Sequence, residues 1–219
     1  MLGSLIGGII MPKTVKLDFY FDPSCPFCWV TSRWLLMVSN QVSLNITWRP
    51  FSLAMKNGEL ADSRADQPHL AAHRVLRVMA AAVEQGSDIG QLYTKLGIRH
   101  FLSGDAYNDD LIVAILHESS LDVNLIQAAD DQTRDRYLSE SMETAIKTVG
   151  SDIGVPTIVF EINNQKMGYF GPVLQSLPDK KEALELWDGL FKLAKQTKFY
   201  ELKRGRDGNG PDVFSTAKC

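Results

Sequence analysis

The feature that most constrains this chain is a pair of cysteines, Cys25 and Cys28, placed where a strand pattern gives way to a helix pattern. Residues 14–21 (TVKLDFYF) are rich in β-branched and aromatic side chains, which is typical of a buried strand. Apolar side chains then recur at helical spacing over 26–39, and Pro26 suits the first turn of a helix because its missing N–H has no helical partner there. The sequence therefore predicts a strand, a turn and a helix that begins at the cysteine pair.

A Cys-x-x-Cys pair at the start of a helix is suited to thiol–disulfide exchange. This reaction needs one accessible thiolate and a second thiol close enough to resolve the mixed disulfide. The unpaired N–H groups and the helix dipole at a helix N-terminus favour negative charge, and so favour a thiolate at Cys25. Cys28 lies one turn further in, and we expect it to be less exposed.

The rest of the chain is predicted to contain a helical block and a second group of strands. Residues 42–48 alternate between apolar and polar, as a half-buried strand does. No strand pattern occurs between about 64 and 150, where three apolar stripes have helical spacing: 71–82, 111–117 and 138–149. Strand patterns return at 157–162 and 166–170, and a last helix is predicted from 179 to 196. The order is βαβ, a helical block, then ββα, which indicates a sheet interrupted by a helical insertion.

Composition argues against several other classes of protein. The 23 basic and 26 acidic side chains give a net charge of −3, so the basic surface of a nucleic-acid-binding protein is not expected. No apolar stretch approaches the roughly 20 residues that cross a bilayer, so no membrane partner is expected. Three cysteines are too few for a disulfide-stapled scaffold, and no glycine-rich phosphate loop follows the first strand. We expect no tightly bound cofactor.

The first residues, 1–11 (MLGSLIGGIIM), are apolar but do not have the organisation of a signal peptide. A basic n-region is missing, the first lysine is Lys13, and no A-x-A type of cleavage site follows. We interpret this stretch as a loose extension or as the consequence of a natural start at Met11. The expected location is the cytoplasm.

Residues 19–29 (FYFDPSCPFCW) resemble the active-site segment of the DsbA-like branch of the thioredoxin superfamily. Val155-Pro156-Thr157 matches the position where that superfamily places its cis-proline, and the helical block matches the DsbA-like insertion. The chain resembles most closely the actinobacterial mycothiol-dependent nitroreductase family, from residue 13 to residue 204. The segments that carry this closer resemblance are Asp22-Pro23, Cys28-Trp29, 31–34 (TSRW), 170–174 (FGPVL), 186–188 (LWD) and 199–204 (FYELKR).

This resemblance implies an α/β protein with a thioredoxin-like fold and an inserted all-helical domain. The expected divisions are an N-terminal extension (1–13), the first part of the thioredoxin-like domain (14–62), the helical insertion (63–152), the second part of the thioredoxin-like domain (153–202) and a tail (203–219). The tail contains three glycines and a proline and has little apolar periodicity, which predicts that it is mobile.

The resemblance also implies roles for particular residues in a thiol–disulfide oxidoreductase. Cys25 would be the nucleophile, Cys28 the resolving thiol, and Pro156 the cis residue that faces them. Residues expected to contact substrate are Pro26, Phe27, Trp29, Val155 and Thr157. The family usually has Trp at the position of Phe27, which bears on substrate preference.

The implied cosubstrate is mycothiol or another low-molecular-weight thiol. The implied partners are proteins that contain a disulfide or are mycothiolated, small electrophiles, and a mycoredoxin or thioredoxin. Because the cytosol is reducing, the expected net direction is reduction, with nitroreductase activity following from the resemblance alone. Alternative functions are a non-redox transferase or isomerase of the kappa-class or 2-hydroxychromene-2-carboxylate isomerase type, and a peptide-binding module without turnover.

The histidines allow other interpretations. His69 and His73 share one helical face and could complete a zinc site with the cysteines, although their distance along the chain argues against it. With Arg77 they form a basic stripe, which is expected to be a solvated helix face or, alternatively, a cleft wall that attracts a carboxylate. His100 is a further candidate, carried only by the resemblance.

Three other side chains have both a functional and a structural interpretation. Asp18 could be a buried carboxylate beneath Cys28 that relays a proton, or it could face outward. Trp29 could pack in the core, line a substrate groove, or do both. Cys219 is expected to be an incidental thiol.

Overall fold

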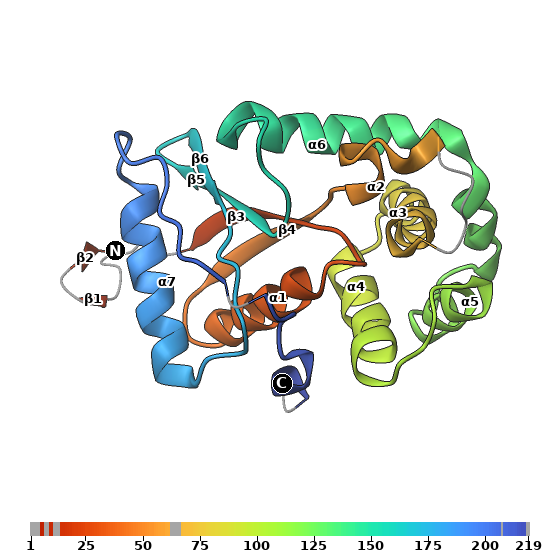
Figure 1. Cartoon of the computed structure of the whole chain (residues 1–219), viewed down its shortest axis with the longest axis horizontal. Helices are drawn as coiled ribbons and strands as arrows, with labels where there is room; N and C mark the ends of the chain where they lie inside the picture. Colours follow the sequence, from red (N-terminus) through yellow and green to blue (C-terminus); the bar gives the residue numbers. More distant parts are fainter. Residues whose placement is uncertain (1–4, 7–8, 11–13, 62–66, 207, 218–219) are drawn as a thin grey trace.

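Figure 1 shows the computed structural model of the 219-residue chain, which describes residues 5–6, 9–10, 14–61, 67–206 and 208–217. At its centre is a four-stranded sheet with the strand order β4-β3-β5-β6. The strands are β3 (Val15–Phe21), β4 (Leu44–Pro50), β5 (Thr157–Ile162) and β6 (Gln165–Phe170). β3 is parallel to β4 and antiparallel to β5, which pairs antiparallel with β6. A separate two-stranded ribbon is formed by β1 (Leu5–Ile6) and β2 (Ile9–Ile10).

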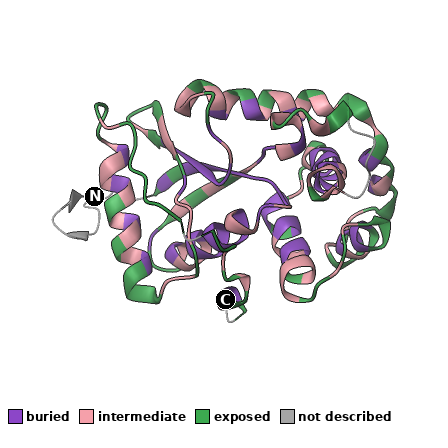
Figure 2. Ribbon diagram, in the orientation of Figure 1, coloured by how far each residue is buried: buried purple, intermediate pink, exposed green. Residues whose placement is uncertain are grey.

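The central strand β3 delivers the cysteine pair. All of its residues except Lys16 are buried, as expected for a strand with a neighbour on each side and helices over both faces (Figure 2). Phe19 lies opposite Trp48 of β4 and Ile158 of β5, which fixes the register. The predicted strand of residues 14–21 therefore differs from the observed one only at Thr14.

Helix α1 (Pro26–Ser39) follows β3, and its bounds are those predicted. It packs against α7 (Lys180–Ala194), where the rings of Trp34 and Trp187 lie 6.2 Å apart. The indole N–H of Trp34 donates to the carbonyl of Ala183 at 3.1 Å. In Figure 1, α6 (Asp135–Val149) runs along the opposite side of the sheet, where it contacts β4, β5 and β6. The sheet is thus covered on both faces.

The insertion between β4 and β5 is helical, as predicted. Besides α6, its helices are α2 (Leu53–Lys56), α3 (Pro68–Glu84), α4 (Ile89–Gly97) and α5 (Asp109–Glu118). Shorter turns of helix are η1 (Glu59–Ala61), η2 (Ile98–Leu102), η3 (Val123–Asp130) and η4 (Gln132–Arg134). Its buried side chains join those of the sheet and of α1 in one continuous hydrophobic core. The insertion is therefore a lobe of the same packed unit.

The sequence analysis missed α4, because glycines interrupt its apolar pattern. Gly90 and Gly97 lie in this helix, where glycine has a low intrinsic propensity. A Cβ atom at Gly90 would overlap the ring of Trp48, and one at Gly97 would overlap the ring of Trp29. The missing side chains thus let the helix approach the sheet and α1 closely.

The C-terminal segment, for which a mobile tail over 203–219 was predicted, is docked on the fold at its helical turn. It ends in the turn of helix η5 (Val213–Thr216), which contacts both α1 and η2. Thr216 is buried, and its hydroxyl accepts the indole N–H of Trp29 at 2.9 Å. These contacts are mostly polar and leave no apolar periodicity, so the sequence did not indicate where the segment docks. Cys219 and most of the predicted N-terminal extension lie outside the described residues.

In the part of the chain that the structure describes, none of the helices combines the length and the apolar character needed to cross a membrane.

Candidate active site

The two cysteines lie at the junction of β3 and α1. Cys25 is the N-cap residue of α1, and its Sγ accepts the backbone N–H of Cys28 at 3.3 Å. This N–H is one of those that a helix leaves without an internal partner, and its hydrogen bond stabilises negative charge on the sulfur. Both cysteines are free thiols; Cys25 is 7% exposed and Cys28 is fully buried.

Val155, in the loop before β5, faces the first cysteine with its carbonyl group. The Sγ of Cys25 lies 3.6 Å from the carbonyl oxygen of Val155. The peptide bond between Val155 and Pro156 is cis, the geometry that the resemblance implied for this position. The side chain of Thr157 is buried, and its hydroxyl donates to the carbonyl of Gly154 at 2.8 Å. The side chain of Thr157 therefore stabilises the turn, and contact of this residue with substrate stays a prediction.

The two thiols have different environments. Burial raises the pKa of the Cys28 thiol well above its ordinary value, and the hydrogen bond with Cys25 and the charge of Cys25 raise it further. Cys28 is therefore held as a protonated thiol behind the more accessible Cys25. This is the asymmetry that a nucleophile and a resolving thiol require.

A buried carboxylate, which the sequence analysis assigned no role, lies beside the cysteines. Asp22 is fully buried, and its Oδ1 accepts from the backbone N–H of Ser24 at 2.8 Å and from the Ser24 hydroxyl at 2.5 Å. Its Oδ2 accepts from the backbone N–H of Leu53 at 2.7 Å, and its own carbonyl accepts from the N–H of Cys25 at 3.0 Å. Burial raises the pKa of Asp22, while the hydrogen bonds from Ser24 and Leu53 act in the opposite direction. Asp22 ties the cysteine turn to the loop after β4.

One sequence signal pointed to this arrangement. An Asp followed by Pro directly after a strand is typical of a turn in which the carboxylate accepts the N–H two residues later. Asp22 makes this contact with Ser24. Its bond to Leu53 could not be seen, because it joins residues that are 31 positions apart.

The structure does not support the proposed proton-relay role of Asp18. Its carboxylate is 8% exposed and lies within the sheet, where Oδ1 is 3.2 Å from Arg49 Nε and Oδ2 is 3.0 Å from Lys166 Nζ. Asp18 therefore neutralises two cations from other strands. The fully buried carboxylate next to the cysteine turn is that of Asp22.

Phe27 and Trp29 differ in their exposure to solvent. Pro26 and Phe27 are half-buried at the start of α1, and the guanidinium of Arg206 lies 5.2 Å from the centre of the Phe27 ring. Trp29 is only 1% exposed and packs against Phe101 with ring centres 5.7 Å apart. Trp29 therefore packs in the core, which is one of the roles expected for it, and its contact with substrate stays a prediction.

The helical insertion contributes two side chains to the site. The hydroxyl of Tyr107 donates to the carbonyl of Pro23 at 2.5 Å, and its ring packs against that of His100 at 3.9 Å between centres. The Nδ1–H of His100 donates to the carbonyl of Asp105 at 2.8 Å, and burial lowers the pKa of this histidine. Burial raises the pKa of Tyr107 well above its ordinary value, and the charges of Asp22 and of the two cysteines raise it further. The insertion thus reaches the cysteine turn through Tyr107.

The predicted basic stripe is not a solvated helix face. His73 is 2% exposed, with Nδ1 2.8 Å from the Ser52 hydroxyl and Nε2 3.0 Å from Asp135 Oδ1. Arg77 binds the same carboxylate through two hydrogen bonds of 2.7 Å. His69 lies 2.9 Å from Glu59. The stripe was misjudged because its partners lie on other elements of the fold.

These contacts also argue against the zinc alternative. The two histidines that would complete the site are bound to Ser52, Asp135 and Glu59. Over the described ranges, no group of three or more His, Cys, Asp or Glu side chains could hold a metal ion.

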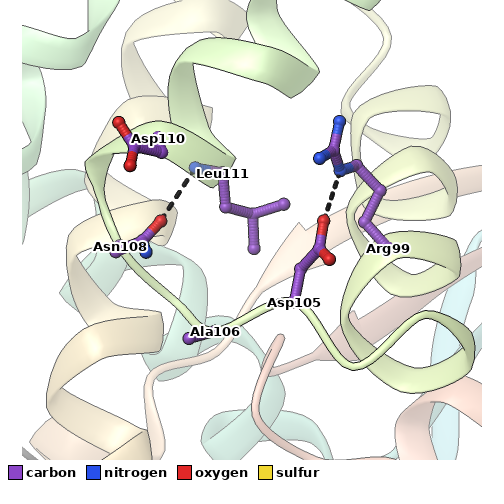
Figure 3. A pocket seen from close by; sticks show the side chains of 6 residues that line it. All are labelled: Arg99, Asp105, Ala106, Asn108, Asp110 and Leu111. Atoms are coloured by element: carbon purple, nitrogen blue, oxygen red, sulfur yellow. Dashed lines mark hydrogen bonds and ion pairs between the residues drawn. The ribbon is translucent and has the colours of Figure 1, made fainter.

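A surface depression of about 230 Å³ lies within the insertion (Figure 3). Arg99 and Asp105 form an ion pair on one side of it, and the Asn108 side chain accepts the backbone N–H of Leu111 on the other. Neither cysteine lines this depression, so it is not part of the dithiol site.

The sequence match now decides the family. Residues 24–204, well over half of the chain, match the model of the family described as Rv2466c-like, mycothiol-dependent nitroreductase Rv2466c. The chain belongs to this family. The Rv2466c-like match includes both cysteines, the helical insertion and the cis-proline loop. Membership supports a thiol-dependent redox function.

One curated relative is the uncharacterized protein Rv2286c of Mycobacterium tuberculosis. It is 29% identical over 194 residues, which cover 86% of this chain and 81% of the relative.

Solved structures with the same fold include enzymes of different chemistry. The cytosolic disulfide reductase DsbM from Pseudomonas aeruginosa is 15% identical, with a TM-score of 0.55 over 81% of this chain and 99% of its own. The probable DsbA oxidoreductase SCO1869 from Streptomyces coelicolor is 16% identical, with a TM-score of 0.55 over 89% and 97%. A 2-hydroxychromene-2-carboxylate isomerase is 17% identical, with a TM-score of 0.53 over 83% and 97%. These likenesses show a DsbA-like thioredoxin fold, and the fold alone does not select among the chemistries.

Proposed function

We propose that this protein is a thiol–disulfide oxidoreductase that uses Cys25 and Cys28 as a dithiol–disulfide couple. The observation that carries the proposal is the paired environment of the thiols. Cys25 caps α1 and accepts a helix N–H, while Cys28 is buried and held protonated. An isomerase on this fold would have no need of a second, buried thiol.

The first step is attack by the Cys25 thiolate on one sulfur of a substrate disulfide. A bond forms between Cys25 Sγ and that sulfur, and the other substrate sulfur leaves as a thiolate. The carbonyl of Val155, 3.6 Å from Cys25 Sγ, lies where the backbone of an extended substrate would pass. Pro26 and Phe27 flank the same sulfur and would contact the substrate.

The second step is resolution by Cys28. Its thiol loses a proton and attacks Cys25 Sγ, which expels the second substrate thiolate and leaves the Cys25–Cys28 disulfide. Two electrons have then passed from the protein to the substrate. Asp22 holds the turn between β3 and Cys25 in place during both steps.

Regeneration of the dithiol requires two equivalents of thiol, which we assign to mycothiol because of the family's description. Two mycothiol molecules would reduce the protein disulfide and leave as mycothiol disulfide. The same dithiol could give two electrons and two protons to a nitro compound, which would yield a nitroso compound and water. A mycoredoxin or thioredoxin is the alternative reductant, and disulfide-containing or mycothiolated proteins are candidate substrates. The proposed location is the cytoplasm.

The test measures which reductant opens the Cys25–Cys28 disulfide and whether a mixed disulfide can be trapped at Cys25. Oxidised protein is mixed with mycothiol, glutathione or a thioredoxin system, and reduction of the Cys25–Cys28 disulfide is followed by alkylation and mass spectrometry. We expect selective reduction by mycothiol. Cys25→Ser should abolish turnover, and Cys28→Ser should accumulate a mixed disulfide at Cys25. Cys219→Ser is the control, which should turn over and resolve its mixed disulfide as the wild type does.

Three other results would change the assignment. Reduction by the thioredoxin system alone would remove mycothiol and the nitroreductase activity from the proposal. Turnover that survives in Cys25→Ser would favour a transferase or isomerase. Peptide binding without any reducible disulfide would favour a binding module.

A further inference from the structure

The C-terminal segment lies against the residues that follow the dithiol. We define the strap as residues 208–217, which lie beyond the family match that ends at Arg204. In Figure 1 the helical turn η5 lies beside α1, and it contacts both α1 and η2. The strap therefore covers the seam between the thioredoxin-like part and the insertion, one residue away from Cys28.

One hydrogen bond fixes the strap on the active-site helix. The indole N–H of Trp29 donates to the Thr216 hydroxyl at 2.9 Å, and that hydroxyl donates to the Val213 carbonyl at 2.6 Å. Trp29 is 1% exposed and Thr216 is 2% exposed. Since the other sides of the Trp29 ring face Phe101 and Tyr93, the strap closes the side on which the indole N–H lies.

A second set of contacts holds the strap on the loop before α7. The backbone N–H of Asp212 donates to the Gln175 carbonyl at 2.7 Å, and the Gln175 side chain donates to the Gly210 carbonyl at 2.7 Å. The N–H of Leu177 donates to the Ser215 hydroxyl at 2.9 Å. Just before the strap, Arg206 places its guanidinium over Phe27, two residues after Cys25. The docked chain thus reaches both Phe27 and Trp29.

The contacts of the strap suit reversible docking. They are mostly single hydrogen bonds, whose net contribution in water is small, and Phe214 leaves 66% of its surface exposed. Gly208 has a φ of +85°, and a side chain added there or at Gly210 would meet no atom within 4 Å. Because glycine adopts a wide range of backbone angles, these two positions allow the chain to turn at the start of the strap. A segment of this kind opens at a low free-energy cost.

We propose that the strap determines the size of substrate that reaches the dithiol, an inference that rests on the proposed function. With the strap docked, Cys25 is 7% exposed beside a covered Trp29 and a Phe27 ring under Arg206, so the entrance admits a small thiol or a small disulfide. When the strap leaves, the seam along α1 and η2 opens beside the dithiol. A disulfide within a folded protein needs this additional surface, because one side of its flanking chain passes Val155 and the bulk of the protein on the other side requires room beside α1.

The test compares one small and one protein disulfide in a single turnover. Reduced full-length protein is mixed with cystamine or with insulin, and oxidation of the Cys25–Cys28 pair is followed by alkylation and mass spectrometry. Thr216→Val removes the acceptor for Trp29, Ser215→Ala removes the acceptor for Leu177, and Thr144→Val is a matched change on the outer face of α6. Loss of one hydrogen bond of the closed state should raise the rate with insulin about fivefold.

The expected result is selective. The rate with cystamine should stay within about twofold of the wild-type rate in all variants, and Thr144→Val should change neither rate. Hydrogen exchange at the Trp29 indole, followed by NMR, should accelerate in Thr216→Val by about the same factor as the rate with insulin. The same NMR spectra show whether that variant is folded.

Each of the other outcomes overturns either the role of the strap or the proposed function. Equal insulin rates in the wild type and both strap variants, with normal oxidation by cystamine, would overturn the role of the strap and leave the proposed function intact. An equal rise with both substrates would show that the strap controls thiol reactivity and not substrate size, which overturns the inference. No oxidation of the wild type by cystamine would overturn the proposed function and the inference together.

Discussion

At the scale of single residues, the site depends on groups that are buried and hydrogen-bonded at the turn before α1. Cys25 is placed by the N–H of Cys28, and the turn itself is placed by Asp22. A fully buried carboxylate is unfavourable unless its oxygens are satisfied. Both oxygens of Asp22 accept hydrogen bonds, so its burial is compatible with a stable fold and a rigid turn.

Replacing Asp22 by Asn tests this role. The Asn side chain would offer an NH2 group to the Leu53 N–H or to the Ser24 donors, and so leave at least one buried donor without an acceptor. We expect a loss of about 1–3 kcal/mol in the free energy of unfolding, measured by urea denaturation. Asp110→Asn, at an exposed position of α5, is the matched control and should change stability by less than about 0.5 kcal/mol. Equal stabilities of the two variants would contradict the structural role of Asp22.

At the scale of elements, polar contacts connect the helices of the insertion with the loop after β4. His73 on α3 bridges the Ser52 hydroxyl, which caps α2, and Asp135 on α6. Arg77 neutralises the same carboxylate. Burial lowers the pKa of His73, although the charge of Asp135 acts in the opposite direction. The buried histidine is thus held neutral within the network.

This network predicts that stability depends on pH. Because the pKa of His73 is lower in the folded state than the ordinary value of 6.5, the unfolded chain binds more protons below about that pH. His73 therefore causes stability to fall as the pH falls from about 6.5 through its folded-state pKa, by at most about 1.4 kcal/mol per pH unit for one proton. Urea unfolding at a series of pH values should show a flatter slope in His73→Gln than in the wild type. His117→Gln, at an exposed position, should keep the wild-type slope; equal slopes in all three proteins would refute the prediction.

The close approach of α4 gives a second prediction at this scale. A methyl group at Gly97 would overlap the Trp29 ring, so Gly97→Ala should lower the free energy of unfolding by about 1–3 kcal/mol. Gly189 lies within α7 with no atom within 4 Å of an added Cβ, so Gly189→Ala should raise stability by about 0.5–1 kcal/mol. Thermal and urea unfolding of the two variants measure this difference in sign. A stabilised Gly97→Ala protein would show that α4 does not pack on Trp29 as described.

At the scale of the whole molecule, the thioredoxin-like part and the insertion form one core. Buried side chains from β3, α1, α3, α4 and α5 belong to one continuous cluster. Polar contacts add to it, including the Ser141 hydroxyl, which donates to the Pro50 carbonyl at 2.7 Å, and the Tyr107 hydroxyl, which donates to the Pro23 carbonyl. The dithiol lies near this junction, so its geometry depends on both parts.

A shared core predicts cooperative unfolding. Tryptophan fluorescence reports on the four tryptophans, Trp29, Trp34, Trp48 and Trp187, all of which lie in the thioredoxin-like part. It should follow the same urea transition as the helical signal in circular dichroism, most of which comes from the insertion. Transitions with separate midpoints would show that the insertion is an independent domain.

The elements were largely predictable because their signals are local. Helix α1 and the strands follow from periodicity and from Pro26, and the resemblance implied the cis peptide bond before Pro156. The predictions that were wrong concern features that depend on contacts between distant segments. His73 and Arg77 were expected on a solvated helix face because the side chains that cover them come from other segments, and α4 was missed because its glycines serve packing and not helix propensity.

Local sequence patterns were sufficient to predict that a cysteine pair opens a helix after a buried strand, and that a helical block interrupts the sheet. Those features depend on residues within one or two turns of each other, where periodicity and capping act. Only the tertiary structure decided which carboxylate lies beside the cysteines and what covers Trp29. The partner of Trp29 is Thr216, 187 residues away along the chain, and no local pattern can encode a hydrogen bond between two residues that only the folded core brings together.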